Sequence, residues 1–174
     1  MAEKPSPGAG PLLDDLLLYR LSRLLAVGGS PVIRLCEGRF RITRREWRVL
    51  ATLMEHGGEG LGSSQLAEVA QLDRARTSRA VGSLAAKGLV SRSQPGGDRR
   101  QVMLRLTDAG RAIHAQLFPL VQQINAELMA ALTPQAAQQF DESLRLLQAR
   151  AEALLTVAAD LPKADRRRRA AARA

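Results

Sequence analysis

Cysteine, histidine and aromatic residues are scarce in this 174-residue chain, and their scarcity argues against several classes of protein. The single cysteine, Cys36, cannot form a disulfide within the chain, which is typical of a reducing compartment. Two histidines, far apart in the sequence, supply neither a zinc site with paired cysteines nor a His-Glu-x-x-His motif. A glycine-rich phosphate loop is also missing. We therefore expect no enzyme, no catalytic residues, no metal site and no cofactor.

Long apolar runs are missing as well. No segment approaches the roughly 18–20 apolar residues that cross a bilayer, so we expect no membrane partner. Residues 1–11 lack the basic start and apolar stretch of a secretory signal, and we expect a cytoplasmic protein. With 45% hydrophobic and 25% charged residues, the chain is typical of a folded domain with its own core.

The net charge of +9 is concentrated in two segments. Residues 74–106 carry eight basic side chains and one acidic one, and residues 163–174 carry six and one. A focused basic patch is the expected footprint of a polyanionic partner, but charge runs are often only solvated surface. Charge alone leaves these two interpretations about equal.

Apolar spacing and capping residues predict a mainly helical N-terminal part. Residues 12–27 predict a helix that starts at Asp14 and Asp15, because acidic side chains stabilise the positive end of a helix dipole. Thr43 and Glu46 have the spacing of a capping box, which predicts the start of another helix.

Two short helices joined by a tight turn are predicted next. Ser63 or Ser64 caps the first helix and Asp73 caps the second. Gly88 ends the second helix directly after Lys87. The second helix has an apolar face at i, i+4 and i+7, formed by Thr77, Val81 and Leu84.

A hairpin and two long helices complete the pattern. Residues 101–106 alternate apolar and polar side chains, as a half-buried strand does, and a Pro-Gly-Gly turn separates them from residues 89–93. Thr107 and Thr133 each start a long helix, and Pro119 lies inside the first of these.

The second short helix has the chemistry of a DNA-reading helix. Arg74, Arg76 and Arg79 lie off its apolar face together with Ser78. Arginine forks match guanine edges or phosphate oxygens, and serine hydroxyls can bind either. One arginine would fit an ordinary surface helix, but three within six residues beside a basic hairpin favour duplex DNA. We add Ser64 to this predicted DNA-binding set.

The tip of the hairpin supplies a second basic group, Asp98, Arg99 and Arg100. An arginine on a slender ribbon can enter the minor groove, where the negative potential is enhanced. Asp98 is interpreted as holding an arginine by a charge-assisted bond, or alternatively as a plain turn residue.

The order of elements predicts a mainly α protein, a winged helix-turn-helix with a two-stranded β wing, flanked by N- and C-terminal dimerisation helices. The expected parts are a disordered N-terminus (1–11), an N-terminal helical dimerisation segment (12–42), a winged helix-turn-helix DNA-binding domain (43–106), C-terminal dimerisation helices (107–158) and a basic disordered tail (159–174).

A homodimer is expected for two reasons. One reading helix contacts only a few base pairs, so specificity generally needs two copies, on a near-palindromic operator with half-sites ~34–36 Å apart. The outer helices also have more apolar surface than a small winged helix can cover. We expect residues 12–27 and 113–157 to form the dimer interface.

Taken in order, several short motifs resemble the MarR family of bacterial regulators over most of residues 12–158. They are residues 42–50 (Ile-Thr-Arg-Arg-Glu-Trp-Arg-Val-Leu), Leu72-Asp73-Arg74, Lys87-Gly88-Leu89-Val90, Asp98-Arg99-Arg100 and Leu106-Thr107-Asp108-Ala109-Gly110. The resemblance implies intertwined terminal helices, repression by promoter occlusion, and frequent control by a small anionic aromatic ligand. It also implies that Asp98 and Arg100 shape the wing and that the arginines of the reading helix lie at the DNA. The arginine-rich tail departs from the family's pattern.

A ligand site is expected at the junction of the dimerisation helices and the reading head, where the family's effectors bind. The candidate ligand is a small aromatic carboxylate or phenolic effector, bound by cations, a hydroxyl and rings. Trp47 is also interpreted as an ordinary core residue. The candidate residues are Tyr19, Arg20, Arg23, Arg34, Trp47 and His114.

Two alternatives stay open at this point. The chain could bind nucleic acid without sequence preference, as a nucleoid-type protein does, although its few aromatic residues do not favour base-stacking platforms. It could instead be a thiol-based redox-sensing regulator that acts through Cys36, which would require an exposed thiol of lowered pKa.

Overall fold

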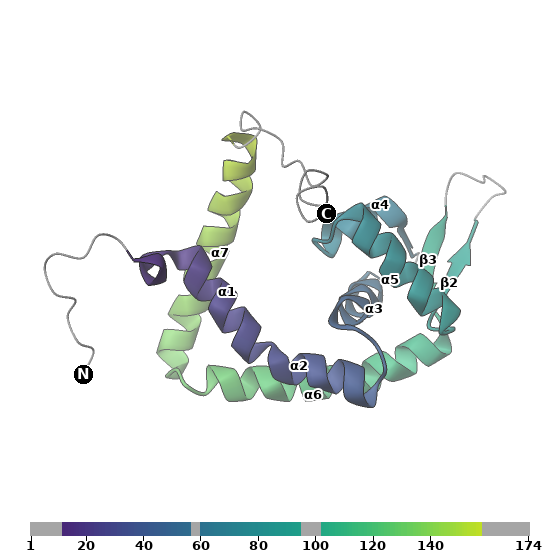
Figure 1. Ribbon diagram of the computed structural model, residues 1–174, viewed down its shortest axis with the longest axis horizontal. Helices are drawn as coiled ribbons and strands as arrows, with labels where there is room; N and C mark the ends of the chain where they lie inside the picture. The colour runs from purple at the N-terminus through teal and green to yellow at the C-terminus, as the bar shows by residue number, and fades with distance from the viewer. Residues whose placement is uncertain (1–11, 57–59, 95–101, 158–174) are drawn as a thin grey trace, which may run out of the picture. The chain divides into compact units, whose positions relative to one another are not determined.

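The computed structural model describes residues 12–56, 60–94 and 102–157 (Figure 1). Helices dominate these segments, and three short strands lie between them. In chain order the elements are a 3-10 turn η1 (Leu13–Asp15), α1 (Leu17–Gly28), α2 (Ser30–Arg34), a π-helical turn η2 (Leu35–Arg39), α3 (Arg44–Glu55), β1 (Leu61–Gly62), α4 (Ser63–Val69), α5 (Arg74–Ala86), β2 (Val90–Ser93), β3 (Met103–Leu106), α6 (Asp108–Met129) and α7 (Pro134–Val157).

The first helix begins later than its acidic residues predict. Asp14 and Asp15 lie in the separate turn η1, and the extended backbone of Leu16 (φ −81°, ψ 117°) divides this turn from α1. The Asp15 carboxylate accepts a hydrogen bond from the Leu12 N–H at 2.8 Å. The acid therefore caps the short turn instead of the long helix.

The core lies within the winged helix and the segments next to it. The capping box at the start of α3 is confirmed, because the Thr43 hydroxyl accepts from the Glu46 N–H at 3.2 Å and Glu46 Oε2 accepts from the Thr43 N–H at 2.5 Å. This start fixes the face of α3 that packs inward. The fully buried apolar side chains come from η2 to α6 and include Cys36, Val49, Leu50, Leu66, Leu84 and Leu117.

The sheet has three antiparallel strands in the order β1-β3-β2, one more than the wing hairpin predicted from the sequence. In β2 and β3, Val90 pairs with Leu106 and Ser93 with Met103. Strand β1 adds the pairs Leu61–Leu104 and Gly62–Met103. Two residues are too short a segment to show alternation in the sequence, so β1 could not be predicted.

The start of α4 differs from the prediction that a serine caps it. The capping position is Gly62, whose N–H donates to Gln65 Oε1 at 3.0 Å, and Ser63 is already the first helical residue. Because Gln65 satisfies the free N–H at this end, no serine is needed as a cap. The hydroxyls of Ser63 and Ser64 remain on the surface.

A tight junction joins α5, β2 and α6. Gly88 follows α5 with a φ of +70°, a conformation that side chains disfavour. A Cβ on Gly110 would lie 2.1 Å from the Leu89 carbonyl oxygen, so only glycine fits there. Thr107 donates from its hydroxyl to the Gly88 carbonyl oxygen at 2.7 Å and accepts from the Gly110 N–H at 3.1 Å. These contacts explain the Leu-Thr-x-x-Gly motif physically.

The chain divides into two compact units, residues 1–128 and 129–174. The first unit holds the winged helix together with α1, α2 and most of α6, and the second holds α7. Thr133 caps α7, accepting from the Ala136 N–H at 3.2 Å. Among the described helices, none is long and apolar enough to cross a membrane. The predicted N-terminus (1–11) and basic tail (159–174) lie outside the described residues.

Candidate nucleic-acid interface

Helix α5 separates a buried face from an exposed polar face. Thr77, Ala80, Val81 and Leu84 are buried, as its apolar spacing predicts. The helix begins at Asp73, whose Oδ1 accepts from the Arg76 N–H at 2.8 Å, which confirms the predicted cap. The face exposed to solvent carries all four residues predicted to bind DNA from this helix, Arg74, Arg76, Ser78 and Arg79.

Asp73 also orients one of these arginines. Its Oδ2 lies 2.9 Å from Arg76 Nε, and half of the Arg76 side chain stays exposed. The carboxylate thus holds the stem of the guanidinium while the outer nitrogens remain free to donate. An arginine held in this way loses less conformational freedom when it binds a base edge or a phosphate.

A groove of about 310 Å³ runs between α4, α5 and the sheet. Ser64 lines it together with Arg74 and Ser78, so the structure brings these three predicted residues to one surface. Arg92 of β2 also lines the groove. The sequence analysis did not select Arg92, although it lies in the basic segment at an outward position of its strand.

A second groove of about 510 Å³ follows the other side of α5. Arg76 and Arg79 line it, and Arg45 of α3 joins them. Arg45 was not predicted as a DNA-binding residue, because nothing in the local pattern shows that the first turn of α3 lies beside α5. The exposed basic surface therefore extends beyond the reading helix.

The tip of the wing, with Asp98, Arg99 and Arg100, lies outside the described residues. The two strands that carry it are described and pair as far as Ser93 and Met103. The predicted roles of the tip residues stay predictions.

A buried ion pair fixes the C-terminal end of α5. Lys87 Nζ lies 2.8 and 2.9 Å from the two carboxylate oxygens of Glu46, and it also donates to the Arg41 carbonyl oxygen at 2.9 Å. Burial raises the pKa of Glu46, but hydrogen bonds from Lys87, Ser83 and the Thr43 N–H outweigh it and hold that pKa below its ordinary value. The pair therefore fixes the end of the reading helix to the start of α3.

Two of the predicted ligand residues meet in an aromatic stack. The rings of Trp47 and His114 lie 5.3 Å apart, and Phe118, one turn further along α6, lies 5.1 Å from His114. Trp47 is buried, as expected for a core residue. Burial lowers the pKa of His114, with a smaller opposing effect from Glu55, so the neutral ring is favoured. Phe118 was missed, although its spacing from His114 places both on one helix face.

The remaining ligand candidates lie at other places. Arg23 binds Asp14 at 2.9 Å and lies over the Tyr19 ring, 5.9 Å from its centre. Arg20 and Arg23 line a shallow groove on α1 of about 330 Å³. Arg34 ends α2 and is exposed. The described contacts thus join Trp47 with His114 and bring Tyr19, Arg20 and Arg23 together on α1, while Arg34 belongs to neither group.

Cys36 has the opposite properties to a sensor thiol. Its side chain is fully buried, and burial raises the pKa of the thiol, with a further contribution from Glu37. A redox sensor needs an accessible thiolate. This geometry argues against the interpretation of Cys36 as a redox switch.

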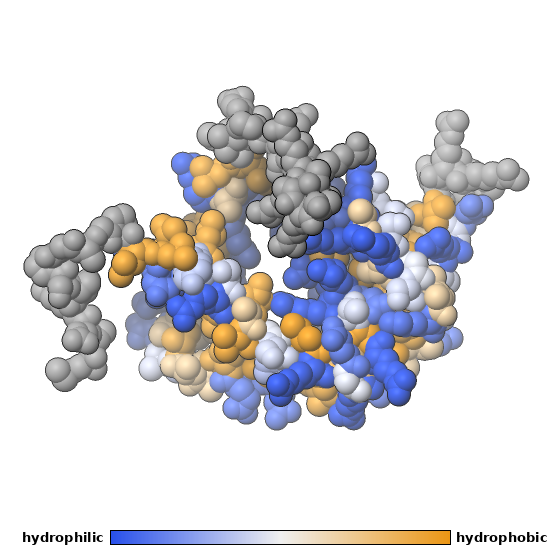
Figure 2. All heavy atoms as spheres, in the orientation of Figure 1, coloured by the Kyte–Doolittle hydropathy of each residue, from blue (hydrophilic) through white to orange (hydrophobic). Residues whose placement is uncertain are grey.

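The helix-turn-helix of α4 and α5, the hairpin that follows it and the exposed arginines of α5 define a winged helix-turn-helix protein. Figure 2 shows the region of α4 and α5 covered mostly by hydrophilic residues, whereas hydrophobic residues gather around η1 and α1. The fold predicted from the sequence is therefore confirmed in class, with β1 as an addition.

Comparison with known proteins finds similarity to one family of transcriptional regulators. The sequence profile of the MarR family matches residues 42–101. A MarR-family transcriptional regulator from Silicibacter pomeroyi has a similar structure, with a TM-score of 0.66, 28% identity, and coverage of 79% of this chain and 91% of that one. Residues 42–101 are therefore similar to the MarR family, and the similarity of fold extends over 79% of this chain.

Two further relatives carry more specific names. The HTH-type transcriptional repressor NicR of Pseudomonas putida is 30% identical over 92 residues, which span 53% of this chain and only 57% of NicR. The fold also resembles that of Bordetella bronchiseptica BpsR, whose DNA binding is regulated by 6-hydroxynicotinic acid. That likeness has a TM-score of 0.62 and 22% identity, and covers 74% of this chain and 98% of BpsR.

Proposed function

We propose that this protein is a sequence-specific, DNA-binding transcriptional regulator that acts as a repressor. The observation that carries the proposal is the division of α5 into a buried apolar face and an exposed face with Arg74, Arg76, Ser78 and Arg79. A helix of this kind enters the major groove with its N-terminal turns, where arginine forks bind guanine or phosphate. Similarity to MarR-family transcriptional regulators supports the same function.

The two grooves beside α5 suit the phosphate strands that border a major groove. Ser64 and Arg92 would bind one strand from the side of the sheet, while Arg45 and Arg79 face the other side of the helix. Phosphate contacts of this kind position a protein on DNA, and base contacts supply its specificity. Binding to chromosomal DNA is consistent with the cytoplasmic location expected from the sequence.

We further propose a homodimer that binds a near-palindromic operator. The outer helices expose many large apolar side chains, which a folded monomer rarely leaves in water. In η1 and α1 the exposed fractions reach 78% for Leu18 and 77% for Val27, and in α7 they reach 71% for Leu155. These residues fall within the predicted interface of residues 12–27 and 113–157.

A small anionic aromatic ligand is the proposed effector. The regulation of BpsR by 6-hydroxynicotinic acid supports a hydroxylated aromatic acid as the class. In this chain the stack of Trp47, His114 and Phe118 offers ring surfaces, and Phe118 is 38% exposed. Ligand binding would release the DNA by favouring a different arrangement of the two reading heads.

Binding without sequence preference is the second candidate function, favoured by the excess of basic residues in the tail. Selection of duplexes from a random library by the purified protein separates the two. Sequence-specific binding predicts that a near-palindromic motif is enriched and that excess unrelated duplex competes poorly at moderate salt. Equal competition by unrelated and selected duplexes would contradict the proposed function.

A further inference from the structure

Positive charge is concentrated at the start of α3. Arg44 and Arg45 occupy its first two positions and Arg48 the fifth, at the end of the helix where the dipole is already positive. Cations at this end destabilise a helix. Among the described residues, no carboxylate forms an ion pair with any of these three arginines. Arg48 donates from one guanidinium nitrogen to the Ala70 carbonyl oxygen at 3.4 Å, a contact that leaves its charge without a counter-ion. Ion pairs among the described residues therefore do not explain why three positive charges gather here.

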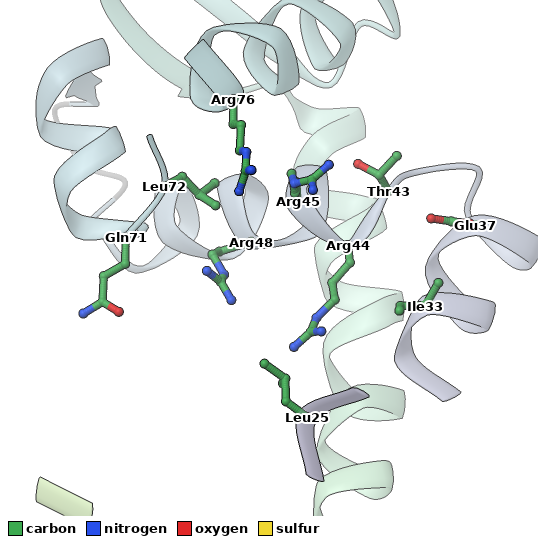
Figure 3. Close-up of a pocket in the computed structure, with 10 residues that line it drawn as sticks. All are labelled: Leu25, Ile33, Glu37, Thr43, Arg44, Arg45, Arg48, Gln71, Leu72 and Arg76. Atoms are coloured by element: carbon green, nitrogen blue, oxygen red, sulfur yellow. The ribbon is translucent and has the colours of Figure 1, made fainter. Parts of the chain in front are cut away.

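The neighbouring acids do not neutralise this charge. Glu46, in the same turn, is buried and engaged by Lys87. Glu37 lines the groove in front of the arginines, but Figure 3 shows it on α2-η2, across the groove from Arg48 and Arg76. A cluster of guanidinium groups that lacks an internal counter-charge is suited to an anion from outside the chain.

The arginines do not all point the same way. In Figure 3, Arg76 extends from α5 toward Arg45 and Arg48, on a groove of about 550 Å³. Arg44 instead extends toward Leu25, and a Cβ added to Gly29 would lie 3.1 Å from its Nη1. Arg44 therefore packs against the end of α1, whereas Arg45 and Arg48 are exposed on the side of Arg76.

Arg45 and Arg76 connect this groove to the reading helix. Both line the second groove beside α5 as well, together with Arg79. The guanidinium groups of Arg48, Arg45, Arg76 and Arg79 thus form a continuous exposed series from α3 to α5. A series of cations suits a strand of phosphates better than it suits a single small anion.

We propose that Arg45 and Arg48 of α3 bind phosphates of the DNA backbone beside the major groove that α5 enters. This inference rests on the proposed function and extends its contact surface to a helix outside the helix-turn-helix. Both side chains would act on any duplex, because phosphate contacts carry no sequence information. A small organic anion is the competing occupant, since Leu25, Ile33 and Leu72 line the same groove.

The test is the salt dependence of DNA binding by the double variant Arg45→Gln/Arg48→Gln. Each lost phosphate contact makes the slope of log affinity against log salt shallower by about 0.9, so the change is roughly 2 per bound subunit. Affinity should fall by the same factor on the selected duplex and on random duplex. The matched control is Arg39→Gln/Arg41→Gln, which removes two exposed arginines that line neither groove and lie outside the proposed dimer interface.

Stability and small anions provide the deciding readouts. Removing the two cations relieves their repulsion with the dipole of α3, whereas losing the hydrogen bond from Arg48 to the Ala70 carbonyl oxygen opposes this gain. The melting temperature of the free variant should therefore stay within about 4 °C of that of wild type. A melting temperature lower by more than about 4 °C, or a slope equal to that of the control, would overturn the inference. Inorganic pyrophosphate provides the second readout. If it stabilises wild type but not the variant, and the variant binds DNA with an unchanged salt slope, the groove binds a small anion and the inference is wrong. If wild type shows no preferred sequence, the proposed function fails, and the slope on random duplex still tests this inference.

Discussion

Lys87 and Glu46, 41 residues apart in the sequence, form an ion pair in which the carboxylate is only 2% exposed. The pair joins the end of α5 to the first turn of α3, and Lys87 also holds the carbonyl oxygen of Arg41. Arg41 has a φ of +54°, which is unfavourable for a side chain as large as arginine. The position of α5 therefore depends on the ion pair between Lys87 and Glu46.

Replacing Lys87 with methionine should destabilise the protein by roughly 2–3 kcal/mol, because it leaves the Glu46 carboxylate buried without its counter-ion. The expected loss of stability is smaller than for a fully buried ion pair, because Lys87 is about one third exposed and water screens its charge. The free energy of unfolding, from denaturant titration, measures it. The double variant Glu46→Gln/Lys87→Met removes both charges and keeps an acceptor for the Thr43 N–H. It should be more stable than Lys87→Met alone, and equal or lower stability would contradict this account of the pair.

His114 should make the stability of the protein depend on pH. Burial lowers the pKa of His114 in the folded protein below its ordinary value of 6.5. The contribution of the neutral ring to the free energy of unfolding is therefore complete above pH 6.5, and it is lost as the pH falls through the folded pKa. Denaturant titrations of wild type and His114→Phe from pH 7.5 to pH 5 measure it. At pH 7.5 the free energies of unfolding of wild type and His114→Phe should differ by less than about 1.5 kcal/mol, because the substitution roughly conserves side-chain volume. An equal loss of stability in both on acidification would show that His114 is not the group responsible.

Local signals in the sequence predicted local structure well. Thr43 and Glu46 cap α3 as their spacing indicated, Asp73 caps α5, and the apolar face of α5 is buried. Each of these depends on residues within a few positions of one another. The same reasoning failed at η1, where Asp15 forms a bond to a nearby N–H that competes with helix initiation.

Contacts between distant segments could not be predicted. Lys87 has the position of a helix-terminal cation, and only the fold shows that Glu46 is its partner. The approach of Arg45 to Arg76 and of Trp47 to His114 also follows from the packing of α3 against its neighbours. Periodicity predicts which face of a helix is buried, but it does not identify the helix that covers it.

Base reading by α5 predicts a specific effect of Arg76→Ala. The variant should lose ~1–3 kcal/mol of binding free energy on the selected duplex and tolerate substitution at one base position. The reason is that Asp73 orients this guanidinium at the start of the reading helix. Fluorescence anisotropy on the selected duplex and on duplexes substituted at single positions measures both effects. The same loss on random duplex would assign Arg76 to phosphate contact alone.

The proposed effector site can be tested with the only tryptophan in the chain. Trp47 stacks on His114, so a planar acid bound at this stack should change its fluorescence. Titration with 6-hydroxynicotinic acid and with benzoate should give a saturable change that His114→Leu weakens at least roughly tenfold, about 1.4 kcal/mol. Saturable binding that is unchanged in His114→Leu would place the ligand elsewhere.

Hydroxyl-radical footprinting on a duplex selected by the protein tests the central claim most directly. Paired winged helices with α5 in successive major grooves predict two protected regions on one face of the duplex, about one helical turn or ~10 base pairs apart. Replacing Arg74, Arg76 and Arg79 with alanine should remove both regions together. Uniform protection of any duplex, or a footprint that survives the triple variant, would contradict the claim that this helix reads DNA.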